Sequence, residues 1–89
     1  MAHIYWDTAS KNTYLLVGNI SASVAYKQLQ LWGLHNNQPV NLGVFDASKQ
    51  GQVLKMKPIQ KVNAFIITLE PKGGSTAPTM ETIYATANL

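Results

Sequence analysis

The chain has 89 residues, of which only 12% are charged, and its formal net charge is +3. A chain of this length can build one domain around one hydrophobic core. All seven basic residues are Lys and they are scattered, a pattern that argues against nucleic-acid binding, where Arg and clustered bases are typical. Because there is no Cys, disulfides and thiolate zinc sites are excluded, and no apolar run is long enough to span a bilayer.

Seven segments of strand-like composition follow one another along the chain, separated by stretches of turn-forming residues. Their apolar residues are largely β-branched or aromatic, which favours strands over helices. The Asn36-Asn37 pair between two of the segments predicts a tight hairpin. The predicted strands are His3–Trp6, Thr13–Asn19, Lys27–His35, Gln38–Phe45, Gln52–Lys57, Asn63–Glu70 and Thr82–Ala87.

Apolar and polar residues alternate in several of these strands, so that each strand has one face to bury. Leu29 and Leu31, for example, alternate with Gln28 and Gln30. Short alternating strands between turns predict an all-β fold, an antiparallel β-sandwich of about seven strands with Ig-like or Greek-key connections. Residues 20–30 have some helical spacing, but they lack a cap and run directly into a β pattern, so we expect no helix there.

Residues that carry chemistry in other proteins are few here and are spread along the chain. The acids are Asp7, Asp46, Glu70 and Glu81. None of them shows the paired spacing of acid–base catalysis or the spacing of a metal site, and neither His3 nor His35 has a second ligand nearby. A nucleophile elbow and a glycine-rich phosphate loop are also missing. We therefore expect a protein that is not an enzyme, with no cofactor and no metal.

Two features each leave two interpretations open. Trp32 alternates with the leucines of its strand, so either both faces of that strand are covered or Trp32 is exposed and recruits a partner; a Trp in a central strand is more often core. The Lys55-Met56-Lys57-Pro58 segment is either an edge strand kept soluble by its lysines or a partner-binding edge, and the first is favoured. In the Tyr5-Trp6 pair, alternation turns one of the two side chains inward.

Two segments of the chain carry a resemblance when they are taken together. The first is Gln30-Leu31-Trp32, followed by Leu42-Gly43-Val44-Phe45, and the second is the thirteen-residue run from Ile67 to Thr79. The pair resembles the C-terminal domain of the anti-sigma-K factor (RskA-like) family, which typically carries Tyr-Gln-Leu-Trp, Gly-x-Phe and Thr-Leu-Glu-Pro-x-Gly-Gly-Ser-x-x-Pro-Thr. The last motif is complete here, whereas Leu29 stands where the family usually has Tyr. Trp6-Asp7 and Leu15-Leu16-Val17 also match, so the resemblance covers nearly the whole chain.

The candidate site residues are those of the family motif, in a structural or a partner-binding role: Gln30, Leu31, Trp32, Glu70, Pro71, Gly73, Gly74, Ser75, Pro78 and Thr79. Much of the second segment makes sense as architecture. Pro71 lacks an N–H and ends the strand, while Gly73-Gly74 permits the positive φ of a tight reversal. Pro78 stiffens the return, and Glu70 can accept hydrogen bonds from backbone amides of the loop.

The resemblance implies a parent protein in the bacterial cytoplasmic membrane, crossing it once. In the family, the cytoplasmic N-terminal part binds a sigma factor, the C-terminal domain lies on the extracytoplasmic (periplasmic) side, and regulated proteolysis releases the sigma factor. No catalytic residues are implied. Because the chain matches only the outer part, we expect residues 1–89 to be one domain of a longer protein whose sigma-binding region and membrane helix are absent here.

Three functions follow as hypotheses. The first is a regulatory domain of a membrane-bound anti-sigma factor that shields a juxtamembrane cleavage site until a signal alters it. The second is a non-catalytic envelope module that binds glycan, peptide or protein through Trp32, Trp6 and the tyrosines. The third is a homo-oligomerisation domain that pairs sheet edges, with Thr13–Asn19 or Lys55-Met56 as the candidate edge.

Overall fold

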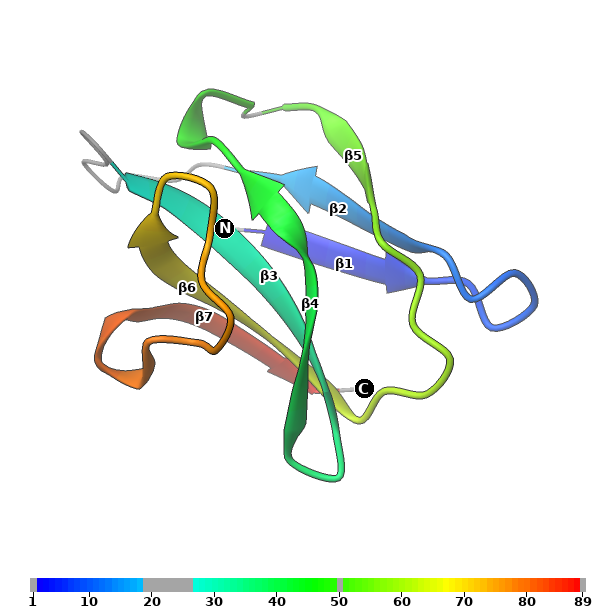
Figure 1. The fold of residues 1–89 in the computed structure, drawn as a ribbon. Coiled ribbons are helices and arrows are strands. Elements are labelled where there is room, and N and C mark those ends of the chain that lie inside the picture. The colour runs from blue at the N-terminus through cyan, green and yellow to red at the C-terminus, as the bar shows by residue number, and fades with distance from the viewer. Residues whose placement is uncertain (1, 19–26, 50, 89) are drawn as a thin grey trace.

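The computed structural model describes residues 2–18, 27–49 and 51–88, and its regular elements are seven β-strands and two short 3-10 turns (Figure 1). In chain order they are β1 (Ala2–Trp6), β2 (Thr13–Val17), β3 (Lys27–His35), β4 (Gln38–Phe45), η1 (Ala47–Lys49), β5 (Val53–Met56), β6 (Ala64–Pro71), η2 (Met80–Thr82) and β7 (Ile83–Asn88). The predicted all-β class is confirmed. Of the disputed segment 20–30, residues 27–30 belong to β3, and residues 19–26 lie outside the described part of the chain.

The strands form two antiparallel sheets, ordered β1-β2-β5 and β4-β3-β6-β7 (Figure 1). This is the strand order of an immunoglobulin-like sandwich, with β1, β2 and β5 in the places of strands A, B and E, and β4, β3, β6 and β7 in those of C′, C, F and G. Since β2 pairs with β1 on one side and β5 on the other, the expectation that Thr13–Asn19 forms a free edge is wrong. The Lys55-Met56 pair does lie in an edge strand, β5.

The hydrophobic core lies between the two sheets and is built from alternate residues of the facing strands. Leu29 and Leu31 of β3 are fully buried there, as their alternation with glutamines predicts. Aliphatic and aromatic side chains from β2, β4, β5, β6 and the connection between β5 and β6 complete the cluster: Leu15, Val17, Leu42, Phe45, Met56, Ile59, Val62, Phe65 and Ile67. In β3, alternation therefore identifies the face that packs between the two sheets.

Short-range turn chemistry sets the connections. Asn36 and Asn37 both have positive φ, which suits a two-residue hairpin between β3 and β4, and His35 pairs with Gln38 across it. After β1, the Asp7 carboxylate accepts hydrogen bonds from the Ala9 N–H and the Ser10 hydroxyl. These bonds hold the turn that leads the chain back into β2.

The segment that joins β5 to β6 closes one end of the sandwich through Ile59. The Ile59 N–H donates to the Lys11 carbonyl at 3.0 Å, and its own carbonyl accepts the Trp6 indole N–H at 3.0 Å. Trp6 is thus turned inward while Tyr5 is 65% exposed, as alternation predicts. The Ile59 side chain packs where β3 has Gly33: a Cβ at Gly33 would lie 2.6 Å from the Ile59 Cδ1.

The Gly33–Ile59 contact can be tested with a double-mutant cycle. We expect Gly33→Ala to lower the free energy of unfolding by about 1–3 kcal/mol because the added methyl overpacks the core. Ile59→Val removes the methyl group that clashes, so the cost of Gly33→Ala should be clearly smaller in the Ile59→Val background. Urea unfolding of the four proteins measures this coupling, and strictly additive effects would contradict it.

Candidate functional site

The loop part of the second family segment, which follows β6, lies over the outer face of the four-stranded sheet, the face turned away from β1, β2 and β5. The connection from β6 to β7, drawn in orange, passes in front of this sheet (Figure 1). Beneath it, Trp32 and Glu70 are 1% and 0% exposed, although neither belongs to the core between the sheets. Parts of the two family segments, which are far apart in sequence, therefore meet in a second buried layer.

Glu70 is the centre of this layer, and each of its carboxylate oxygens accepts two hydrogen bonds. Oε1 accepts the hydroxyls of Ser75 and Thr79, both at 2.7 Å. Oε2 accepts the Thr68 hydroxyl at 2.6 Å and the Thr79 backbone N–H at 2.8 Å. The sequence predicted backbone amides as the donors. One backbone amide donates to Glu70, and the other three donors are side-chain hydroxyls. We call Trp32, Thr68, Glu70, Ser75 and Thr79 the Glu70 network.

All four donors to Glu70 are neutral, so its charge is stabilised by hydrogen bonds rather than by a cation. Burial raises the pKa of the carboxyl group, whereas the bonds from Thr68, Thr79 and Ser75 lower it by more. The result is a pKa of about 2, below the usual value of 4.5. Glu70 is therefore ionised at neutral pH, and its charge draws the loop residues Ser75 and Thr79 onto β6.

Thr68 connects Trp32 to this carboxylate. The Trp32 indole N–H donates to the Thr68 hydroxyl oxygen at 2.9 Å, and the hydroxyl donates onward to Glu70. Of the two interpretations of Trp32, burial is confirmed, and exposure toward a partner is wrong because the loop covers it. Thr68 was missed as a site residue, although its place two residues before Glu70 puts both side chains on one face of a strand.

Two glutamines of β3 hold the loop from the other side. The Gln30 side chain accepts the Ser75 N–H at 2.9 Å and donates to the Ser75 carbonyl at 3.2 Å. It also donates to Asn41 of β4 at 2.9 Å, which satisfies a side chain that is only 1% exposed. Gln28 accepts the Gly73 N–H at 2.8 Å in the same manner. The glutamine face of β3, which alternation predicts to be the wetter one, is thus paired with loop backbone.

The remaining motif residues shape the loop or belong to the core. β6 ends at Pro71, whose carbonyl accepts the Gly74 N–H at 2.9 Å. Gly73 and Gly74 have φ of 91° and 87°, a backbone region that other residues rarely adopt. Pro78 is half-buried at the far side of the loop. Leu31, by contrast, is fully buried between the sheets and takes no part in the Glu70 network.

The Glu70 network attaches the loop to the sheet and leaves no group free to react. Its one ionised group is enclosed, and all its hydrogen-bonding capacity is engaged by the protein itself. Within residues 2–18, 27–49 and 51–88, no three His, Asp or Glu side chains gather in a way that suits a metal ion. The same residues include no helix long and apolar enough to cross a membrane.

The pH dependence of stability tests the charge of Glu70. Because its pKa is lower in the folded protein than in the unfolded chain, its contribution is complete above about pH 5 and is lost as pH falls toward about 2. The depression corresponds to about 3 kcal/mol. We expect Glu70→Gln to cost about that much at pH 7, since the amide places a donor where only acceptors fit.

Urea unfolding between pH 7 and pH 2 measures both effects, and the gap between Glu70→Gln and the parent chain should narrow as the pH falls. Glu81→Gln is the matched control, because Glu81 is exposed, and it should stay within about 0.5 kcal/mol. A gap that does not depend on pH would contradict a buried, ionised Glu70.

The close approach of the loop to the sheet gives a separate prediction for Gly74. A Cβ there would lie 2.8 Å from Val44 Cγ1 and 3.0 Å from the Gln30 side-chain oxygen, on a backbone with positive φ. We expect Gly74→Ala to lower the free energy of unfolding by about 1–3 kcal/mol. At Gly73, where a Cβ would meet nothing within 4 Å, the same change should cost less because only backbone strain applies. Thermal unfolding of the two variants compares them, and equal losses would contradict the contact.

Comparison with known proteins agrees with this geometry. A family model described as "Anti-sigma-K factor rskA, C-terminal" matches residues 1–83, which include β1 to β6 and the whole of the Glu70 network. No curated protein and no solved structure matches the chain. The family is one of membrane-associated regulators of transcription that act on a sigma factor. Because the match covers almost the entire chain, this protein belongs to the anti-sigma-K factor family, as its C-terminal domain.

Proposed function

We propose that this chain is the extracytoplasmic, periplasmic domain of a membrane-anchored anti-sigma factor, and that it controls when the sigma factor is released. In this proposal, residues 1–89 form one domain of a longer parent protein, whose cytoplasmic part binds the sigma factor. The domain itself acts without catalysis. Its fold shields a cleavage site next to the membrane, and a signal that alters the domain exposes that site to regulated proteolysis.

The observation that carries the proposal is the joining of the two family segments by the Glu70 network. Those segments are the most specific part of the family resemblance, and they are used to fasten a loop to a sheet. What such a network provides is a single, well-defined folded shape. A shape of this kind serves steric shielding, which depends on the folded state and not on a reactive group.

A second function, as a binding or oligomerisation module of the envelope, has one observation in its favour. The outer face of the three-stranded sheet carries apolar side chains in the open: Tyr5 and Val53 are 65% and 66% exposed, and Leu16 is 39% exposed. Tyr5 and Tyr14 are paired there with ring centroids 6.3 Å apart. Neighbouring exposed apolar side chains of this kind are compatible with contacts to other molecules.

The two proposed functions predict different effects of deleting this domain on sigma-dependent transcription. If the domain shields the cleavage site, removing residues 1–89 from the parent protein should raise sigma-dependent transcription without a signal and abolish the response to the signal. The destabilised Gly74→Ala protein should shift the basal level in the same direction, and Glu81→Gln, the matched surface control, should not. A transcriptional reporter reads all of these. Unchanged basal release and an unchanged signal response after deletion would overturn the regulatory proposal and favour a binding module.

A further inference from the structure

Three shallow hollows follow one another along the side of the sandwich where β4 and β5, edge strands of the two sheets, face each other. Their volumes are about 460, 400 and 280 Å³. The first and second share Pro58, and the second and third share Val44, Lys55 and Met56. They therefore adjoin one another, and we call the three together the β4–β5 groove.

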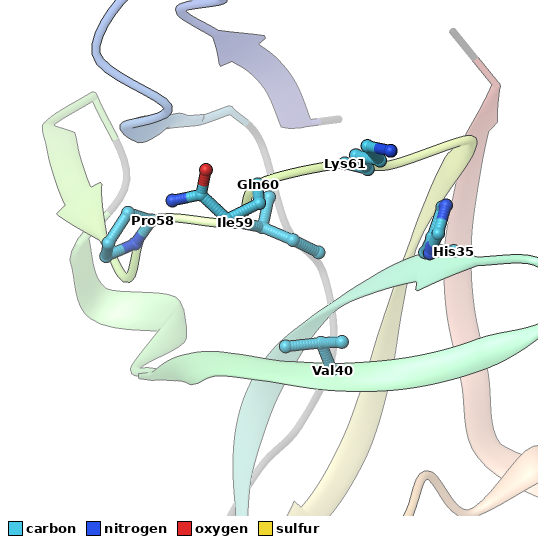
Figure 2. A pocket seen from close by; sticks show the side chains of 6 residues that line it. All are labelled: His35, Val40, Pro58, Ile59, Gln60 and Lys61. Atoms are coloured by element: carbon cyan, nitrogen blue, oxygen red, sulfur yellow. The ribbon is translucent and has the colours of Figure 1, made fainter.

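The floor of the groove is apolar and held in place. In the first hollow, Ile59 and Val40 lie between Pro58 at one end and His35 and Lys61 at the other (Figure 2). The backbone of Ile59 is fixed on both sides by the hydrogen bonds to Lys11 and Trp6.

In the second hollow, Met56 packs against Gly43, and the Lys57 N–H donates to the Leu42 carbonyl at 2.9 Å. That bond links the strand β4 to the segment after β5. Since both hollows are bounded by backbone contacts of this kind, the groove is formed before any partner arrives, which lowers the entropic cost of binding.

Positive charge is concentrated along this groove. Lys61 lines the first hollow, Lys55 and Lys57 the second, and Lys49 and Lys55 the third, so four of the seven lysines lie on it. All four are exposed. The only carboxylate along the lining is Asp46, which accepts a hydrogen bond from Gln28 at 3.0 Å. On a chain with a net charge of +3, this side attracts anions more strongly than the rest of the surface.

We propose that the β4–β5 groove binds an extended acidic peptide segment of a partner protein, with apolar side chains in the hollows and carboxylates beside the lysines. Extended peptides bind beside sheet edges, and β4 and β5, which are edge strands of their sheets, contribute lining to the second and third hollows. An anionic polymer without apolar groups would leave each floor unfilled, and a flat lipid surface cannot enter a concave site. The inference concerns this surface alone and does not depend on the regulatory role.

A second copy of the chain is a poor occupant of the groove. Apart from Asp46, its acids are Asp7, Glu70 and Glu81, of which Glu70 is buried. They stand on separate segments, so the chain offers no run of alternating acidic and apolar residues. The partner is accordingly a different protein.

The test uses the 89-residue chain, labelled with ¹⁵N, and a capped eight-residue peptide of alternating glutamate and leucine. NMR titration should show saturable shifts confined to β4, β5, residues 57–61 and the other lining residues Gln28, His35, Asp46 and Lys49. The same peptide with lysine in place of glutamate, and one with serine in place of leucine, should each bind at least about tenfold more weakly, because the first loses the charge match and the second the apolar contacts. Affinity for the parent peptide should fall as salt is added.

Lysine variants inside and outside the groove distinguish binding at the groove from a general effect of the protein's positive charge. The triple change Lys55→Gln, Lys57→Gln and Lys61→Gln should weaken peptide binding at least about tenfold, whereas Lys27→Gln with Lys72→Gln, which lie outside the groove, should change it less than about twofold. Val40→Ser tests the apolar floor and should also weaken binding. Thermal unfolding of each variant checks that the fold is kept.

Several outcomes would overturn the proposal. They are the absence of saturable binding, equal loss in the two lysine variants, equal binding of the serine peptide, and shifts centred on Tyr5 and Val53. Binding to anionic lipid vesicles is measured as well. If they bind the parent chain more strongly than the peptide does and lose that binding in the triple variant, the groove lysines serve a membrane surface instead.

Discussion

The buried carboxylate of Glu70 is the interaction on which the outer half of this molecule depends. An ionised group removed from water is destabilising unless its hydrogen-bonding capacity is met in full. Here it is met by Thr68 on the same strand and by Ser75 and Thr79 on the loop that follows. The loop must therefore lie where it does, and once it does, Trp32 is covered and its indole N–H has Thr68 as a partner.

This arrangement buries both faces of the central strands β3 and β6. One face packs against β1, β2 and β5, and the other is closed by the loop from β6 to β7. On the second face the contacts are made by polar side chains: Gln28 and Gln30 accept hydrogen bonds from backbone N–H groups of the loop. A polar layer that is fully paired in this way specifies a single loop position more sharply than an apolar one, because every unmet bond is costly.

The surface of the domain is divided between features of different character. The open face of the three-stranded sheet presents tyrosines and aliphatic side chains, while the side formed by β4 and β5 presents lysines around apolar hollows. The Glu70 network lies on neither surface, whereas Leu42, Gly43 and Val44 of the first family segment line the β4–β5 groove.

The sequence by itself determined the fold class, the strands and, for β3 and β6, the face that packs between the two sheets. Leu29, Leu31 and Ile67 follow a period of two, and Asn36-Asn37 marks its hairpin, because these signals arise from neighbours along the chain. It also pointed to Glu70, Pro71, Gly73 and Gly74 as loop-forming residues. The sequence did not predict contacts between residues that are distant along the chain. The hydrogen bonds from Trp32 through Thr68 to Glu70, and those between Ser75 and Gln30, depend on the register between β3 and β6.

Only the tertiary structure decided which strands are edges and what lies beside the groove lysines. Thr13–Asn19 resembles an edge segment in the sequence, yet β2 is the central strand of its sheet. Lys49, Lys55, Lys57 and Lys61 come from one stretch of the chain, and packing of β4 beside that stretch adds the apolar residues Val40, Leu42 and Val44 to form the groove. Strand order and the meeting of two sheets depend on contacts between residues far apart in the chain, and the period of a single strand carries no information about them.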